Sequence, residues 1–349
     1  MRIESDIKLD YQDVLLKPKR SRLTSRKDVA MEREFKFMHS PHIYKGLPII
    51  ASNMDGVGTF SMAKVLQKHK MVTVIRKHYD ISDWDQAVAS GLDLNFVSIC
   101  TGTNKIWDKN APDYKAMKQI LNKYPDISFI TVDVANGYHQ NFVDFLSTVR
   151  EDYPSKTIIA GNVITAEMTE ELILNGADIV KCGIGPGSVC TTRIMTGVGI
   201  PQFSGMIECA DAAHGVGGLV IADGGCVYPG DVAKAFGAGS DFVMLGGMLA
   251  GHDESEGEIV DGSIEFYGMS SDMAMQIHGA RKDGYRGAEG KLVRIPYRGA
   301  VEDTLVEIIG GVRSACTYIG AERIKDMPKC ATFVQVSHQV NSVFNHFNS

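Results

Sequence analysis

One stretch of the chain shows the unit from which its fold is built: Gly176-Ala177-Asp178-Ile179-Val180-Lys181-Cys182-Gly183-Ile184-Gly185-Pro186-Gly187-Ser188-Val189-Cys190-Thr191-Thr192-Arg193. The largely apolar run over 177–182 has the composition of a buried β-strand, and a loop rich in glycine follows it. Glycines lack a Cβ, so backbone groups in such a loop can approach a ligand or an ion closely. The stretch therefore predicts a strand whose carboxyl end carries a binding loop.

The same unit recurs along the chain. Apolar runs alternate with helical patterns about eight times, which is typical of βα units on a parallel sheet. The expected strands are 47–52, 71–75, 95–100, 127–134, 157–161, 178–182, 219–222 and 241–245. The expected helices are 60–69, 84–89, 114–123, 141–151, 166–174, 206–213, 230–236 and 302–319. Eight units predict an α/β fold closed as a (β/α)8 barrel, and an open doubly wound sheet is the alternative.

Length and charge narrow the class of protein. The 349 residues, 44% of them hydrophobic, suit a single barrel domain over 1–349, with a flap inserted at about 251–298 and no inserted regulatory domain. A net charge of −6 argues against nucleic acid or an anionic membrane as partner, and no apolar run reaches the roughly 18 residues of a membrane span. Seven cysteines without CxxC spacing favour a reducing, cytoplasmic location over disulfides or zinc.

Small and polar residues follow nearly every expected strand, and in barrels these loops build the active site. Asp223-Gly224-Gly225 and Gly246-Gly247 follow the last two strands, where barrels often bind phosphate through backbone amides. Cys190, presented by the glycine loop, is a candidate nucleophile, although cysteine is also common as a small buried apolar residue. A phosphosugar isomerase or lyase would share the phosphate loops but would leave the cysteine loop unexplained.

The cysteine loop, with Thr196-Gly197-Val198-Gly199 after it, resembles the catalytic loop of the inosine monophosphate dehydrogenase and guanosine monophosphate reductase family. The likeness runs from about Lys8 to the C-terminus. Further stretches resemble the reductase branch: Asn53-Met54-Asp55, Lys77-His78-Tyr79, Asp133-Val134-Ala135-Asn136-Gly137-Tyr138, Met248-Leu249-Ala250-Gly251-His252, Tyr267-Gly268-Met269-Ser270 and Glu289-Gly290-Lys291.

The resemblance implies NADPH-dependent reductive deamination of GMP to IMP and ammonia. By similarity, Cys190 would form a covalent thioimidate at C2 of the purine, and Thr192 and Glu289 would share the proton transfer. The positions that match the family's nucleotide contacts are Asp223, Gly224, Gly225, Gly246, Gly247, Gly268, Met269, Ser270, Arg286, Gly287, Ala288 and Gly290.

The same resemblance implies a cofactor site, a cation site and an oligomer. The positions that match NADPH contacts are Lys77, Asp133, Val134, Ala135, Ile184, Gly185, Met269, Tyr285, Arg286, Ser314, Ala315, Cys316 and Thr317, with Ser25 and Arg26 reaching the adenine end from a neighbouring subunit. The carbonyls of Gly185, Gly187 and Cys190 match those that hold a monovalent cation, K⁺ by expectation. A homotetramer is expected from the family.

Two other functions remain open at this stage. Inosine monophosphate dehydrogenase oxidises IMP with NAD⁺ through the same cysteine adduct, but its family hydrolyses that adduct with a longer flap carrying an Arg-Tyr pair. The third possibility is a barrel that binds a purine nucleotide without turnover. The combination of Cys190, Thr192 and Glu289 argues against it, because function is read from the site and not from the fold.

Overall fold

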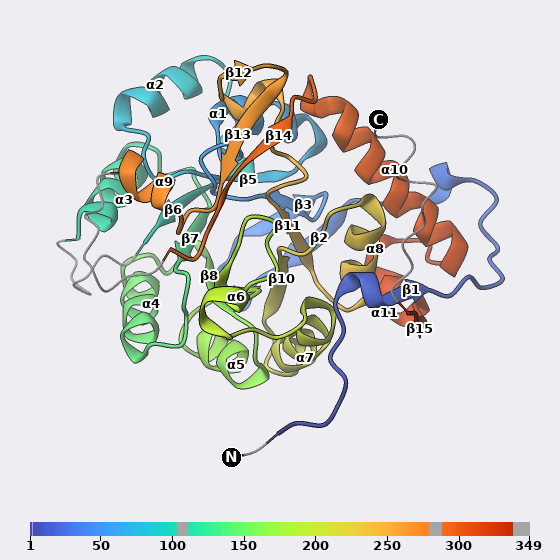
Figure 1. The fold of residues 1–349 in the computed structure, drawn as a ribbon. Helices are drawn as coiled ribbons and strands as arrows, with labels where there is room; N and C mark the ends of the chain where they lie inside the picture. Colours follow the sequence, from blue (N-terminus) through green and yellow to red (C-terminus); the bar gives the residue numbers. More distant parts are fainter. Residues whose placement is uncertain (2, 103–110, 279–287, 338–349) are drawn as a thin grey trace.

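The computed structural model describes residues 1, 3–102, 111–278 and 288–337, and its centre is a closed parallel barrel (Figure 1). The strands pair in the order β10-β11-β4-β5-β6-β7-β8-β9, so the sheet closes on itself and the open doubly wound alternative is wrong. The strands are β4 (Ile49–Ala51), β5 (Val72–Ile75), β6 (Val97–Thr101), β7 (Phe129–Asp133), β8 (Thr157–Val163), β9 (Ile179–Cys182), β10 (Leu219–Asp223) and β11 (Phe242–Leu245).

Each strand is followed by a helix that packs on the outside of the barrel. These helices are α1 (Phe60–Leu66), α2 (Ile81–Ala89), α3 (Pro112–Lys123), α4 (Gln140–Asp152), α5 (Ala166–Leu174), α7 (Gln202–Gly215), α8 (Pro229–Gly237) and α10 (Val301–Ile319). All eight expected strands and helices are present, with ends that differ by a few residues. None of the described helices is both long and apolar enough to cross a bilayer.

A hairpin that the sequence pattern did not predict closes the amino-terminal end of the barrel. It consists of β2 (Arg33–Lys36) and β3 (Ile43–Gly46), which pair antiparallel. The Phe35 ring stacks on Phe242 with centroids 4.2 Å apart, and Tyr44 meets Phe129 edge to face at 5.7 Å. Phe242 and Phe129 begin β11 and β7, so these rings seal the end of the barrel opposite the binding loops.

The segment expected as a flap is itself folded. It forms a three-stranded antiparallel sheet of β12 (Ile259–Val260), β13 (Ser263–Tyr267) and β14 (Leu292–Pro296), with α9 (Asp272–Ile277) between the last two strands (Figure 1). Near the chain ends, β1 (Val14–Leu16) pairs with β15 (Phe333–Gln335), which follows α11 (Met327–Cys330). A short helix, α6 (Thr192–Thr196), directly follows the cysteine loop.

We expect Phe35→Ala to lower the free energy of unfolding by about 3–5 kcal/mol, the usual cost of removing a buried phenyl ring from a core. Phe35 is 2% exposed. Ile43→Ala in the same hairpin is the matched control, because Ile43 is 55% exposed and should cost less than about 0.5 kcal/mol. Urea denaturation of the three proteins checks this, and equal losses in both variants would contradict the role given to the hairpin.

Candidate active site

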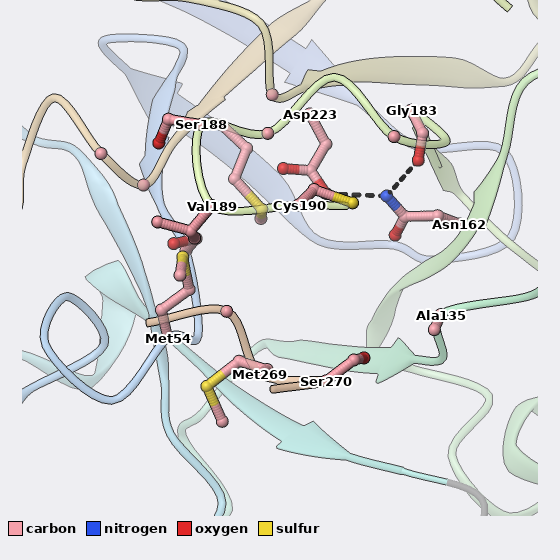
Figure 2. Close-up of a pocket in the computed structure, with 18 of the residues that line it drawn as sticks. Met54, Ala135, Asn162, Gly183, Ser188, Val189, Cys190, Asp223, Met269 and Ser270 are labelled. Carbon is pink, nitrogen blue, oxygen red and sulfur yellow. Dashed lines mark hydrogen bonds between the residues drawn. The ribbon is translucent and has the colours of Figure 1, made fainter. Parts of the chain in front are cut away.

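A deep cavity opens at the carboxyl ends of the barrel strands (Figure 2). The empty space between its walls, open solvent included, is about 1150 Å³. Asp133, Lys181 and Asp223 contribute from the ends of β7, β9 and β10, and loops after β4 and β11 complete the floor. Met269 and Ser270 line it from the flap, and Figure 2 shows them across the cavity from Asp223.

Cys190 lies in this cavity at the end of the glycine loop, and its side chain is half-buried. The amide of Cys190 donates to the carbonyl of Gly187 at 3.0 Å, which turns the chain just before α6. Gly185 has φ +84°, and a Cβ there would lie 2.5 Å from Cγ of Arg193, so the loop requires glycine at that position.

A chain of hydrogen bonds connects the thiol to a carboxylate. Sγ of Cys190 lies 3.2 Å from Oγ1 of Thr192, and this hydroxyl donates to Oε2 of Glu289 at 2.8 Å. Each hydrogen bond is donated toward Glu289: the thiol donates to the hydroxyl, and the hydroxyl donates to the carboxylate. One proton shifted along this chain would leave a thiolate at Cys190 and a protonated Glu289.

Backbone contacts hold Glu289 against the cysteine loop. The Thr191 amide donates to the carbonyl of Glu289 at 2.9 Å, and the Glu289 amide donates to the carbonyl of Ser270 at 3.1 Å. Cys190 and Gly290 form an antiparallel β-bridge, and the Lys291 amide donates to the carbonyl of Val189 at 3.0 Å. The flap and the nucleophile loop are therefore one hydrogen-bonded unit.

A buried ammonium group forms the charged centre of the floor. Nζ of Lys181 lies 2.7 Å from Oδ1 of Asp133 and 2.8 Å from Oδ2 of Asp223, and Lys181 is 4% exposed. Burial alone would lower the pKa of Lys181, but the two carboxylates outweigh it and raise that pKa. Burial likewise favours a higher pKa for Asp133, and the Lys181 ammonium outweighs it, so the pKa of Asp133 is lowered.

Two asparagines extend this network. Nδ2 of Asn162 donates to Oδ2 of Asp223 and to the carbonyl of Gly183, both at 2.8 Å (Figure 2). Nδ2 of Asn53 donates to Oδ2 of Asp133 at 2.9 Å. Oδ1 of Asn162 is buried and has no hydrogen-bond partner among the described residues, which is unusual for a buried amide oxygen.

Lys181, Asn162 and Asn53 are absent from the set of site residues that the sequence predicts. A lysine inside an otherwise apolar strand was the available signal for Lys181, since a buried lysine requires partners. Each asparagine directly follows an expected strand. This position predicts that both lie at the active-site end of the barrel, but it does not predict what either side chain contacts.

Glycines from several loops line the same cavity. Gly224 has φ +90°, and a Cβ there would lie 3.0 Å from Cγ of Pro186. The close approach lets the loop after β10 pack against the cysteine loop and presents backbone amides to the cavity. The glycines that line it are Gly183, Gly185, Gly187, Gly224, Gly225, Gly246, Gly247 and Gly268.

Most of the sequence-predicted site residues that the structure describes meet here. Besides those glycines, the cavity is lined by Asp133, Val134, Ala135, Ile184, Cys190, Thr192, Asp223, Met269, Ser270 and Glu289. Ala288 and Gly290 flank Glu289. Tyr285, Arg286 and Gly287 lie outside the described residues.

Other predicted residues lie elsewhere. Lys77 donates to Oδ2 of Asp113 at 3.0 Å and lines a smaller pocket. Ser25 and Arg26 lie at the start of a short 3₁₀ helix that packs against α10, the helix that carries 314–317. Within 314–317, Cys316 is fully buried in the core. Neither Ser25 and Arg26 nor any residue of 314–317 lines the cavity.

The family described as "IMP dehydrogenase / GMP reductase domain" matches residues 8–342. The GMP reductase of Citrobacter koseri is 56% identical over 351 residues, covering 99% of this chain and 99% of that relative. The GMP reductases of Shigella boydii serotype 4 and Escherichia coli O157:H7 are each 56% identical over 352 residues, covering 99% of this chain and all of the relative. The chain belongs to the IMP dehydrogenase / GMP reductase family.

Proposed function

We propose that this enzyme is an oxidoreductase that converts GMP to IMP and ammonia at the expense of NADPH. The single observation that carries the proposal is the chain from Cys190 through Thr192 to Glu289, which lies in the cavity at the carboxyl ends of the barrel strands. The relatives named GMP reductase match over the full length and therefore support the same reaction.

The relay supplies a nucleophile and an acid together. Once the thiol proton has moved through Thr192 to Glu289, the Cys190 sulfur attacks C2 of guanine, which is electron-poor between two ring nitrogens. The C2–N2 bond breaks as Glu289 returns the proton to the leaving amine, and ammonia departs. A covalent thioimidate between Cys190 and the purine remains. Hydride addition at C2 and loss of the C–S bond then give IMP and restore the thiolate.

The floor of the cavity suits the sugar and phosphate. Asp223 can accept hydrogen bonds from ribose hydroxyls because the Lys181 ammonium and the amide of Asn162 hold its carboxylate in place. Backbone amides around Gly224, Gly225, Gly246 and Gly247 can bind the phosphate. Met269 and Ser270 line the wall contributed by the flap, where the purine would lie. Arg286, Gly287, Ala288 and Gly290 are proposed to complete the nucleotide site.

The cofactor site is proposed beside the purine. The unpartnered Oδ1 of Asn162 fits a group that donates hydrogen bonds, such as the carboxamide of a nicotinamide. Asp133, Val134, Ala135, Ile184, Gly185 and Met269 line the same cavity and would hold the nicotinamide and its ribose. Lys77, Tyr285 and Arg286 are proposed further along the dinucleotide. When bound, NADPH supplies the hydride.

The adenine end of the cofactor implies a second subunit. Ser25, Arg26 and residues 314–317 gather on the outside of the barrel, away from this chain's own cavity. We infer that they serve the cavity of a neighbouring copy in a homo-oligomer, with the family's tetramer as the expected form. Because Cys316 is buried, only Ser314, Ala315 and Thr317 within 314–317 have side chains that can reach a ligand.

A monovalent cation is proposed in the cysteine loop. The carbonyl oxygens of Gly185, Gly187 and Cys190 are neutral donors of the kind that suit K⁺, and the glycines leave room for them to converge. A bound cation would order the loop that presents the nucleophile. In this proposal the whole chain acts as one barrel domain, with the flap as part of its active site.

We expect wild-type protein with GMP and NADPH to consume the reduced nicotinamide, and Cys190→Ala to abolish this turnover. Affinity for GMP should stay within about tenfold, because the sugar and phosphate contacts remain. Cys330→Ala, which removes a half-buried thiol on α11, is the matched control and should retain activity. Turnover of IMP with NAD⁺ alone would identify a dehydrogenase, and ligand binding without any redox change would identify a non-catalytic barrel.

Glu289→Gln should slow ammonia release at least about 100-fold, because it removes the group that carries the proton and keeps its shape. The hydride step, followed in reverse from IMP and NADP⁺ in single-turnover experiments, should slow much less. Thr192→Val should behave like Glu289→Gln, whereas Thr192→Ser keeps the hydroxyl and should be near wild type. Equal slowing of both steps in Glu289→Gln would count against the relay.

Lys181→Met should lower the free energy of unfolding by about 3–5 kcal/mol near neutral pH, because it leaves two carboxylates without their buried counter-charge. The folded pKa of Lys181 is raised and that of Asp133 is lowered, so the contribution is complete between the two unfolded values, from about pH 4 to about pH 10. It is lost as the pH falls through the folded pKa of Asp133 or rises through that of Lys181.

Urea denaturation across pH measures this loss. Lys123→Met is the control, because the Lys123–Asp85 pair is nearly half-exposed on both sides and should contribute less than about 1 kcal/mol. A loss in Lys181→Met no larger than in this control would rule out the network as the organiser of the floor.

A further inference from the structure

Three potential metal ligands from separate segments meet beside the active-site mouth. Asp55 follows β4, His78 follows β5, and His278 ends α9. One ligand atom from each lies within 4.8 Å of the other two. Nε2 of His278 is 2.6 Å from Oδ2 of Asp55, and the two imidazole rings stack with centroids 3.4 Å apart and planes 7° apart. None of the three lines the catalytic cavity, so the group is separate from the proposed chemistry.

Only one of the two carboxylate oxygens of Asp55 has hydrogen-bond partners among the described residues. Oδ2 accepts from the Tyr267 hydroxyl at 2.8 Å as well as contacting His278. Oδ1 is buried and has no hydrogen-bond partner among the described residues, and Asp55 as a whole is 7% exposed. A buried carboxylate oxygen without a partner is costly, and a cation bound to this carboxylate would reduce that cost.

The basic side chains near Asp55 bind groups other than its carboxylate. The Arg76 guanidinium donates to the backbone carbonyl of Asp55 at 2.8 Å and pairs with Glu256 at 3.3 Å. Lys77 pairs with Asp113 at 3.0 Å. Among the described residues, His278 is the basic side chain in contact with the Asp55 carboxylate.

We propose that Asp55, His78 and His278 bind a divalent transition metal ion of borderline softness, such as Zn²⁺ or Co²⁺. Two imidazoles and one carboxylate are a usual ligand set for these ions, and water would take the remaining position. Tyr267, bonded to the carboxylate, is the outer partner that orients a ligand in such sites.

Both imidazoles must rotate out of their present stack to bind one ion. Two ligands at about 2.1 Å from a tetrahedral ion lie about 3.4 Å apart, and the ligand atoms of the three residues now lie within 4.8 Å of one another. Parallel rings direct their nitrogens side by side, so the imidazoles must tilt toward each other to converge on one ion. His278 directly follows α9, and its rotation would exchange the stack on His78 for a shared ion while Asp55 stays within reach.

The ion would act as a clamp. Asp55 and His78 belong to loops fixed on barrel strands, whereas His278 belongs to the flap that also carries Glu289. Coordination by all three would fasten α9 to the barrel. The site rests on its own geometry and not on the proposed reaction, so either can fail without the other.

Titration of metal-free full-length protein with Co²⁺ tests the proposal, because the visible bands of Co²⁺ report a low-symmetry protein site. Cys190→Ala should be used as the background, since it removes a cavity thiol that could compete for the ion. We expect one Co²⁺ per chain, with visible bands and without a thiolate-to-metal charge-transfer band. Zn²⁺ should displace it and should raise the thermal midpoint of unfolding.

Variants locate the site. His278→Gln should weaken Co²⁺ binding by more than about tenfold and abolish the Zn²⁺ stabilisation, and Tyr267→Phe should weaken binding by about tenfold. His69→Gln is the matched control, because His69 forms another histidine–carboxylate pair, with Glu302 at 2.8 Å, and should leave binding unchanged. His278→Gln serves as the main variant since Asp55→Asn alters a buried group and can impair folding.

Several results would overturn the proposal. They are the absence of visible bands at submillimolar Co²⁺, bands that survive in His278→Gln, or an equal loss in His69→Gln. Any of these would leave Asp55 and His278 as a simple ion pair.

Discussion

A single buried ammonium group organises the floor of the active site. Lys181 cannot lie inside the barrel without counter-charges. Asp223 supplies one from β10, the strand next to β9, and Asp133 supplies the other from β7, two strands away on the opposite side. The two carboxylates likewise require the lysine, because they would repel each other at this distance without it. The proposed ribose-binding and nicotinamide-binding acids are thus held at a fixed separation by one side chain.

Much of the fold could be predicted because the barrel strands are short apolar runs separated by helical patterns. The 33–46 hairpin was not predicted, since its strands alternate in burial and contribute only Phe35 and Tyr44 to the core. The flap sheet was also missed. β14 has exposed and half-buried residues in alternation, and nothing in such a pattern states which partner strand it will pair with.

The candidate site also contains residues that the sequence predicted and residues that it did not. Cys190 was found from its place in a glycine loop, and the roles of Thr192 and Glu289 came from a resemblance carried by local motifs. The fold brings all three into one hydrogen-bonded chain. Lys181 and Asn162 could not be assigned because their roles depend on partners far away in the sequence. Lys77 matched a motif, yet its ammonium pairs with Asp113, a contact that no local pattern encodes.

The join between the flap and the nucleophile loop has an evolutionary consequence. The contacts of Thr191, Glu289, Gly290 and Lys291 across this junction are made by peptide groups, which every residue type except proline provides in full. Side chains elsewhere in the flap can therefore change while the carboxylate keeps its place beside the sulfur, but Gly290 cannot, because a Cβ there would lie 3.0 Å from the amide nitrogen of Ser271. Diversity of flap sequence is then compatible with an unchanged reaction, and selection is free to use that surface for other purposes.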